Sequence, residues 1–303
     1  MILEYSVFLR ELNDIMFKGN SEALLTQIAN MSDIHIDIFK LTALKTNLIQ
    51  NILQLYEIKF YMALEGIVQK YFNILGFTVL PNHLVTKETI YCASCDMQQI
   101  VKKRNTIYLI EQKIRDDHDS TKKVGQFTNF EAKYFEISNK YKDSEVIPIM
   151  WFIDASLRKN KNYYLEQMEK MSSFYDCSPR LYYGQEMFSK SENGISDFPI
   201  DMWNEIVEYL KLWKKNLPDM PEVNFDLNSE QVFLEIRDLS PCVYRKLFEN
   251  EDIKQQILPI IFGKGIVLEK LKDYFLAKNQ LVYNNLASII GQYLAELRDN
   301  KAL

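Results

Sequence analysis

The sequence predicts a mixed α/β (α+β) core with a central mixed β-sheet flanked by helices, between two helical regions. Three observations support this fold class. Apolar residues recur at helical spacing up to about residue 75, β-branched and aromatic residues dominate short runs between 77 and 183, and strand signals vanish from Pro199 onward. The 303 residues therefore divide into a helical N-terminal segment (1–58), an α/β core (59–198) and a helical C-terminal region (199–303).

The N-terminal part is typical of consecutive amphipathic helices, because spacings of three and four persist and no proline occurs before Pro81. Ser32 and Asp33 are a plausible break and cap. A long helix through residues 60–71 is expected to end near Gly76. Glycine has no Cβ and so readily adopts the left-handed backbone conformation that commonly ends a helix.

The core follows as alternating strands and helices. We expect strands over 77–80, 88–101 and 106–114, a helix over 125–140, a buried strand over 146–153 and a weaker strand over 181–183. Beyond it, helical patterns occupy 203–213, 229–237, 244–248 and 266–297, and the turn at 218–221 is the best candidate boundary.

Composition and charge limit the classes of protein to which this chain can belong. The chain carries 36 basic and 41 acidic residues, a net charge of −5 with a pI near 5.5, which argues against a protein that coats nucleic acid through bulk positive charge. Local basic patches remain compatible with that balance. The N-terminus lacks a signal-peptide pattern and no apolar run approaches the ~18 residues of a membrane span, so we expect a cytoplasmic protein. Cys92 and Cys95 form a lone CxxC, best interpreted as reduced cysteines.

One group of polar residues stands where packing alone does not explain it: Asp96 and the Glu111-Gln112-Lys113 run. If Lys103 and Arg104 are the central residues of a hairpin turn, Asp96 and Glu111 are directly opposite, with Cβ atoms ~5 Å apart. Two carboxylates so placed need a cation, and strand alternation puts Lys113 on the same face as Glu111.

This donor set suits Mg²⁺, which takes one or two protein carboxylates and completes its shell with water and substrate phosphate. A bound metal would activate water and neutralise phosphate charge, while Lys113 would position or help deprotonate the attacking water. The spacing therefore indicates phosphodiester hydrolysis. The alternative is an exposed strand end with a same-face Glu111/Lys113 pair, which contributes little.

Asp96, fourteen intervening residues and Glu111-x-Lys113, on a hairpin between a long helix and a later helix and buried strand, resemble the PD-(D/E)xK nuclease superfamily over roughly residues 60–188. The run 110–126 is similar to type II restriction endonucleases. Cys95 stands where the family name has proline, at a position that varies widely. The resemblance implies a restriction-endonuclease-like fold and DNA cleavage with Mg²⁺, for which Mn²⁺ can substitute.

The resemblance also assigns roles to neighbouring residues. Glu65, on the helix before the hairpin, matches an acidic residue that many such nucleases use as an additional metal or water ligand; a solvated helix residue is the alternative. Gln126 matches a polar position near the metal or the DNA backbone. Further candidates for DNA contact are Arg115, His118, Ser120, Lys122, Lys123, Lys103 and Arg104.

The acids of the run 115–123 are open to two interpretations. Asp116, Asp117 or Asp119 could orient the basic side chains, or the run could be a solvated loop in which Asp119 or Ser120 caps a helix.

Three functions remain open at this point. The leading one is a sequence-specific restriction enzyme acting on double-stranded DNA, in a prokaryotic cytoplasm and paired with a DNA methyltransferase that protects host sites. A homodimer would read a palindromic site, and a monomer or transient dimer could handle a site without two-fold symmetry. The second keeps the fold but acts in DNA repair or recombination. The third is a DNA-binding module with a decayed site, which the joint presence of Asp96, Glu111 and Lys113 argues against.

Overall fold

The computed structural model describes residues 1–30, 44–81, 99–116, 119–189, 198–217 and 222–302. The chain forms two compact units, each built from two stretches. The first comprises Met1–Ile15 and Phe60–Leu217, and the second comprises Met16–Lys59 and Pro218–Leu303. The three segments expected from the sequence follow one another along the chain, whereas these units interleave.

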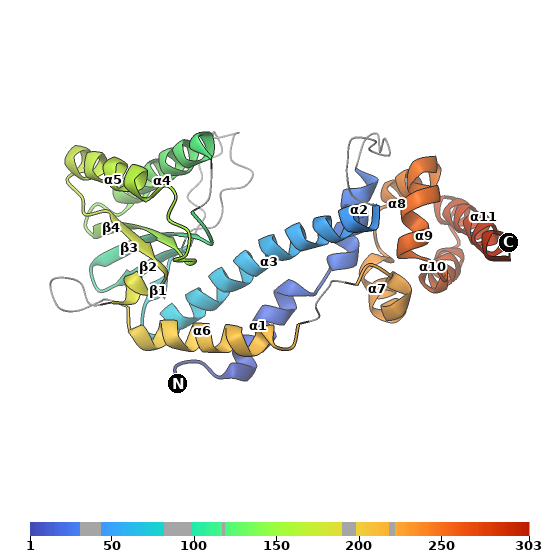
Figure 1. The fold of residues 1–303 in the computed structure, drawn as a ribbon, viewed down its shortest axis with the longest axis horizontal. Helices are drawn as coiled ribbons and strands as arrows, with labels where there is room; N and C mark the ends of the chain where they lie inside the picture. The colour runs from blue at the N-terminus through green and yellow to red at the C-terminus, as the bar shows by residue number, and fades with distance from the viewer. Residues whose placement is uncertain (31–43, 82–98, 117–118, 190–197, 218–221, 303) are drawn as a thin grey trace. The chain divides into compact units, whose positions relative to one another are not determined.

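A five-stranded sheet organises the first unit (Figure 1). Its strands lie in chain order, β1 (Thr78–Val79), β2 (Gln99–Lys103), β3 (Thr106–Lys113), β4 (Glu145–Phe152) and β5 (Arg180–Tyr183). β2 is antiparallel to both of its neighbours, β1 and β3, whereas β3, β4 and β5 run parallel. This confirms the predicted mixed sheet and the α/β fold class. Of the expected strand 88–101, the structure describes only the part from Gln99.

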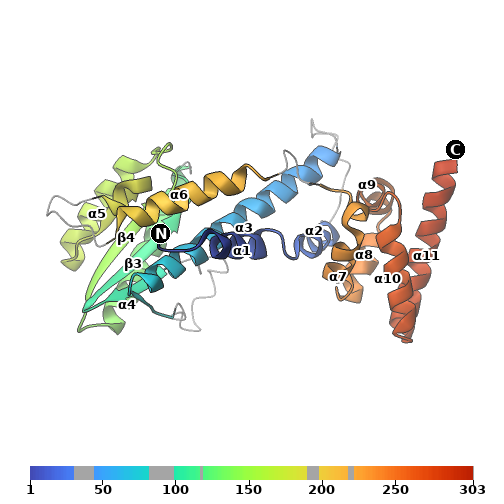
Figure 2. The same cartoon turned by 90° about the horizontal axis from the view of Figure 1, so that it is seen from below.

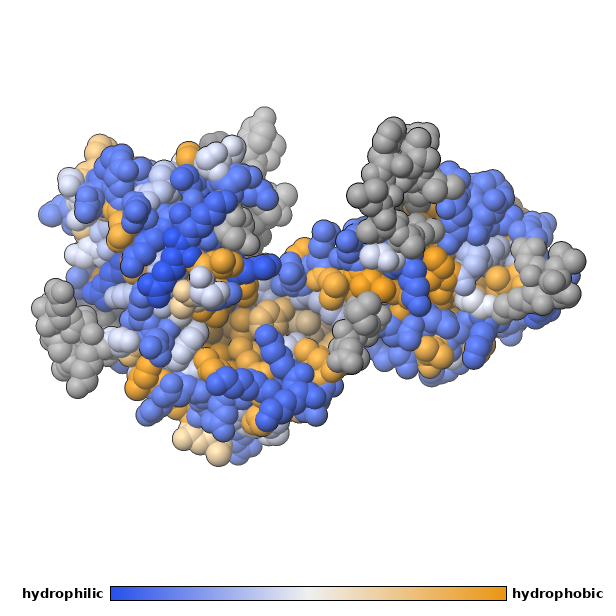
Figure 3. Space-filling view, viewed as in Figure 1, coloured by the Kyte–Doolittle hydropathy of each residue, from blue (hydrophilic) through white to orange (hydrophobic). Residues whose placement is uncertain are grey.

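Helices α4 (Ser120–Lys140) and α5 (Lys161–Tyr175) cover one face of the sheet (Figure 1). Their buried side chains share a core with β3 and β4, including Phe130, Tyr164 and Leu109. Over these two helices the surface seen in Figure 3 is mostly hydrophilic, as expected of amphipathic helices. The helix predicted from residue 125 begins earlier, because the Asp119 side chain accepts a hydrogen bond from the Lys122 backbone nitrogen and caps it.

The opposite face packs against α6 (Ile200–Lys214) and the end of α3 (Leu44–Ile74). Trp203 of α6 contacts Trp151 of β4, with ring centroids 6.1 Å apart. The N-terminal stretch, with α1 (Tyr5–Met16), joins this layer, since the Glu205 carboxylate accepts hydrogen bonds from the backbone nitrogens of Ile2 and Leu3. Seen from below, α6 lies in front of the sheet, with the N-terminus beside it (Figure 2).

A glycine ends α3 just before the first strand of the sheet begins. Gly76 has a φ of 81°, and the backbone nitrogen of Phe77 donates to the carbonyl of Phe72 at 2.9 Å. Together they form a Schellman ending of the predicted kind, after which β1 begins.

The hairpin between β2 and β3 differs from the prediction. Lys103 pairs with Thr106 and Gln99 with Ile110, so Arg104 and Asn105 are the central residues of the turn, with a φ of 56° at Arg104. A turn on Lys103 and Arg104 was wrong, and so was the register derived from it, because hairpin register follows from which residues form the turn. Gln99↔Ile110 is the last described pair, and Asp96 lies outside the described residues.

The second unit is helical. It contains part of α3 and helices α2 (Asn20–Ala29), α7 (Ser229–Ile236), α8 (Pro241–Glu249), α9 (Leu258–Ile261), α10 (Ile266–Ala277) and α11 (Leu281–Ala302). Their apolar faces share one core. Buried Asp226 accepts hydrogen bonds from three backbone nitrogens at the start of α10, those of Lys264, Gly265 and Val267. In the described part of the chain, no helix combines the length and apolar character needed to cross a membrane.

Candidate active site

Glu111 is a carboxylate held inside the first unit. It lies near the end of β3, is 4% exposed, and pairs with Met150 of the parallel strand β4. Strand alternation places it on the same face as Leu109, which packs under α4 and α5. Burying a charged group is unfavourable unless it is paired, so the partners of Glu111 determine what this position can do.

Two lysines pair with Glu111. The Lys113 Nζ lies 2.7 Å from Oε1 of Glu111, and the Lys133 Nζ lies 3.1 Å from Oε2. Lys113 comes from the same strand, as predicted, whereas Lys133 comes from α4. Both carboxylate oxygens therefore face an ammonium group.

Glu65 of α3 is the second acidic group of the site. It is buried, and burial followed by the negative charge of Glu111 raises its pKa to about 7, while Lys113 and Lys133 oppose that rise. Its electrostatic coupling to these three residues places Glu65 in one charged cluster with them. The role of Glu65 as an additional metal or water ligand stays a prediction.

Two further polar features lie near this cluster. One turn before Glu65, the Tyr61 hydroxyl is buried without a hydrogen-bond partner, and burial together with Glu111 and Glu65 raises its pKa. On the other face of β3, Gln99 Nε2 donates to the Glu65 carbonyl at 3.2 Å and to Oε1 of Gln112 at 2.9 Å. The glutamine pair therefore ties α3 to β2 and β3.

The carboxylates of Glu65 and Glu111 offer the hard oxygen donors that Mg²⁺ prefers, and Mg²⁺ needs only one or two of them. The described residues contain no cluster of three or more His, Cys, Asp or Glu side chains suited to a metal. These two residues fit a divalent ion that retains several waters, and predicted ligand Asp96 lies outside the described range.

The polar run after Lys113 divides into structural and exposed residues. Asp116 is fully buried and accepts hydrogen bonds from Asn160 and from the Tyr183 hydroxyl, so it braces the start of α5. Asp119 is the helix cap already described. Arg115, Ser120 and Lys122 are exposed, and Lys123 lies 4.7 Å from the ring of Tyr163. His118 and Asp117 lie outside the described residues.

Two of the other predicted residues, Lys103 and Arg104, lie apart from Glu111. Lys103 and Arg104 are at the hairpin turn, where Thr106 begins β3, and Glu111 is five residues further along, ~16 Å at the rise of a strand. Gln126, on α4, accepts a hydrogen bond from the Tyr164 hydroxyl at 2.9 Å. The structure does not bring Lys103 and Arg104 together with Glu111 and Lys113.

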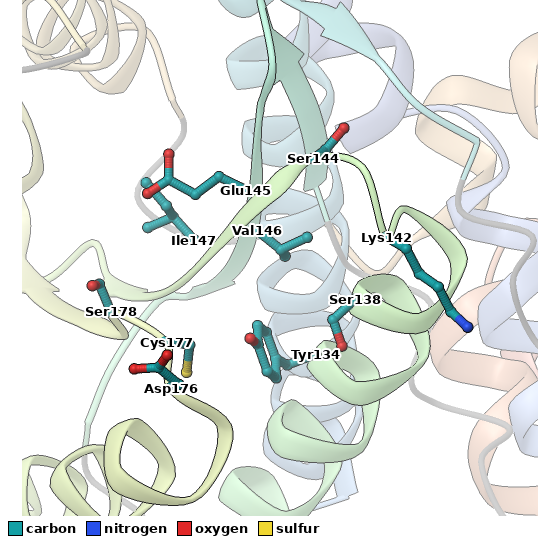
Figure 4. Close-up of a pocket in the computed structure, with 10 residues that line it drawn as sticks. All are labelled: Tyr134, Ser138, Lys142, Ser144, Glu145, Val146, Ile147, Asp176, Cys177 and Ser178. Carbon is teal, nitrogen blue, oxygen red and sulfur yellow. The ribbon is translucent and has the colours of Figure 1, made fainter.

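A pocket of about 300 Å³ lies elsewhere in this unit (Figure 4). It is lined by Tyr134, Ser138, Lys142, Ser144, Glu145, Val146, Ile147, Asp176, Cys177 and Ser178. Glu145 pairs with Thr106 at the start of β3, so this pocket and Glu111 lie toward opposite ends of that strand. Burial raises the pKa of the Cys177 thiol. Cys177 and Cys242 are free thiols, and Cys92 and Cys95 lie outside the described residues.

Comparison with known families decides the identity. The model of a type II restriction endonuclease family, HinfI, matches residues 14–213, which is 200 of the 303 residues. The chain belongs to the HinfI family of type II restriction endonucleases. The match covers the whole sheet and the Glu111–Lys113 motif, so the predicted restriction-endonuclease resemblance is confirmed for this HinfI-family chain. The search of curated proteins and the search of solved structures found no match.

Family membership gives this chain a class of activity. Restriction endonucleases of this family are DNA nucleases that act on double-stranded DNA, and type II enzymes typically use a divalent metal ion. Helices α7 to α11 of the HinfI-family chain lie beyond the matched residues.

Sequence reasoning missed Lys133 and Tyr61. The signal for Lys133 was helical phase: it lies seven residues after Gln126 and three after buried Phe130, on the side of α4 that faces the sheet. Tyr61 lies four residues before Glu65, and so on the same helix face.

Proposed function

We propose that this chain is a sequence-specific, Mg²⁺-dependent endonuclease that hydrolyses phosphodiester bonds of double-stranded DNA as the type II enzyme of a restriction-modification system. The observation that carries the proposal is the Glu111–Lys113 pair, 2.7 Å apart on one strand and coupled to Glu65, inside a HinfI-family fold.

The chemistry follows from the groups present. Glu111 and Glu65, together with Asp96, would hold the divalent ion through carboxylate oxygens. When bound, the ion supplies a Lewis acid that activates water and neutralises phosphate charge. Lys113, held by Glu111, would position the attacking water or help deprotonate it, and its positive charge would stabilise the negative charge that develops on the scissile phosphate.

DNA contact is assigned to polar residues around this cluster. Arg115, Ser120, Lys122, Lys123 and His118 would follow the backbone beside Glu111, and Gln126 would contribute from the same helix. Lys103 and Arg104 would contact phosphates further along the duplex, at the hairpin turn.

The assembly and its setting follow from the activity. Cutting both strands usually takes two active sites, which a homodimer supplies for a palindromic sequence and a monomer or transient dimer replaces for an asymmetric one. The helical C-terminal region (199–303) would serve DNA recognition or dimer contacts. A restriction enzyme needs a DNA methyltransferase that protects the host's own sites. It meets its DNA within the cell, so the proposed activity implies a prokaryotic cytoplasm.

A plasmid of known sequence tests the function. The purified protein is incubated with it in Mg²⁺, in Mn²⁺ or in EDTA, alongside the Lys113→Ala variant and a Lys170→Ala control whose lysine forms an exposed pair with Glu166. We expect discrete fragments with either metal from the wild type and the control, and none from Lys113→Ala. Smearing or junction-specific cutting would support a repair nuclease, and no cutting in any divalent metal would reject the nuclease proposal.

A further inference from the structure

Lys133 gives Glu111 one more cation than the nuclease motif requires. Its Nζ lies 3.1 Å from Oε2 of Glu111, and Lys113 already occupies Oε1 at 2.7 Å. The Glu111 side chain is 5% exposed, so water gives it little screening and both ion pairs act at short range. A divalent ion that uses Glu111 therefore meets a carboxylate whose two oxygens are already paired.

The two lysines differ in how they are attached. Lys113 lies two residues from Glu111 on one strand, so the strand itself holds them on the same face. Lys133 reaches Glu111 from α4, 22 residues away in sequence, through a flexible four-carbon side chain. Its ammonium can swing away while the helix stays in place, because the buried Phe130 and Tyr134 anchor α4 against the sheet.

We propose that the Lys133 ammonium pairs with Oε2 of Glu111 in the metal-free enzyme and competes with the divalent ion for that oxygen. The inference rests on the proposed function, because it takes Glu111 as a metal-holding residue. A divalent ion bound at Glu111 would displace the Lys133 ammonium from Oε2.

Competition between Lys133 and the metal fixes the direction in which metal affinity changes when the Lys133 charge is removed. A competing cation weakens metal binding, so removing the Lys133 charge must strengthen it. A lysine that merely supported the site would give the opposite sign, because its loss would leave the buried carboxylate less well ordered. Without metal, the same removal lowers stability, since Glu111 keeps one partner fewer.

The test measures binding of Mn²⁺ alone to the full-length chain, without DNA, by titration calorimetry and by the spin-resonance signal of free Mn²⁺. For Lys133→Met we expect the dissociation constant to fall by about 3- to 10-fold, as expected when one partly screened unit charge near the ion is removed. Lys133→Arg keeps the charge and should bind like the wild type. Lys170→Met, which breaks the exposed pair with Glu166, is the matched control and should leave binding unchanged.

Equal or weaker Mn²⁺ binding by Lys133→Met overturns the proposal, as does a wild type that binds no Mn²⁺. Lys133→Gln, which retains a hydrogen-bond donor without charge, replaces the Met variant if the latter does not fold, and the same tighter binding is expected. Plasmid cleavage separates the two proposals. Tighter binding without cleavage by the wild type sustains this inference and rejects the nuclease, whereas cleavage without tighter binding does the reverse.

Discussion

Gln99 on β2 donates a hydrogen bond of 3.2 Å from its side-chain Nε2 to the backbone carbonyl of Glu65 on α3. The same nitrogen donates to Gln112 on β3, whose neighbours in sequence are Glu111 and Lys113. One buried amide thereby links the helix that carries Glu65 to the strand that carries Glu111.

Replacing Gln99 with leucine should lower the free energy of unfolding by about 1–3 kcal/mol, because the Glu65 carbonyl and the Gln112 amide lose a buried partner. Urea denaturation measures the change. Gln231→Leu is the control, since that exposed glutamine bonds only Glu235 among the contacts described for its side chain. Wild-type stability in Gln99→Leu would show that the link contributes nothing.

The raised pKa of Glu65 predicts how stability varies with pH in EDTA. Its ordinary pKa is 4.5 and its folded pKa about 7, so between these values the folded state keeps a proton that the unfolded state has released. The free energy of unfolding therefore falls as pH rises from 4.5 through 7. Glu65→Gln should lose this dependence and exceed the wild type in stability at higher pH.

Thermal unfolding across this pH range tests the Glu65 prediction. Glu166→Gln is the control, because Lys170 lowers the pKa of Glu166, and replacing that carboxyl brings no gain at high pH. A Glu65→Gln profile that runs parallel to the wild type would contradict the prediction.

Asp96→Ala and Lys113→Ala should each reduce cleavage by about 100-fold or more, the usual contribution of a metal ligand or an acid-base group, while DNA binding in EDTA persists. Gel-shift titration and a timed plasmid digest measure the two properties separately. If either variant cut at close to the wild-type rate, that residue would be no part of the site.

Alanine substitutions of Asp116 and Asp119 should differ sharply in their effect on stability, although both residues lie in one polar run. Asp116→Ala removes the acceptor of three buried hydrogen bonds and should destabilise the fold by about 3 kcal/mol or more. Asp119→Ala removes only an exposed helix cap, with a smaller loss. Chemical denaturation of both variants makes the comparison, and equal losses would refute the bracing role of Asp116.

Removing the charges of Lys122 and Lys123 together should weaken DNA binding and reduce its salt dependence by about two counterions. We expect a smaller loss when Lys103 and Arg104 are replaced, because they lie at the far end of β3 from Glu111. Fluorescence anisotropy at several salt concentrations ranks the pairs. A larger loss at the hairpin turn would move the proposed DNA path to that end of the sheet.

The positions of most core elements and the Glu111-x-Lys113 motif were predictable from the sequence. Helical and alternating periodicities are local, so the predicted strands 106–114 and 146–153 lie within one residue of those observed. The Gly76 ending of α3 and the order of the core were predicted in the same way. The Glu111-x-Lys113 spacing is equally local, and strand alternation alone puts both side chains on one face.

The partners that these elements meet across the fold were not predictable from the sequence. The hairpin register depends on a positive φ at Arg104, which residue preferences do not specify, so the turn was misplaced by one residue. Lys133 reaches Glu111 because α4 packs over β3, and Asp116 is a buried brace because α5 begins beside it. Such contacts join residues more than 20 positions apart in the sequence. They form through long-range packing, which the local spacing of residues does not reveal.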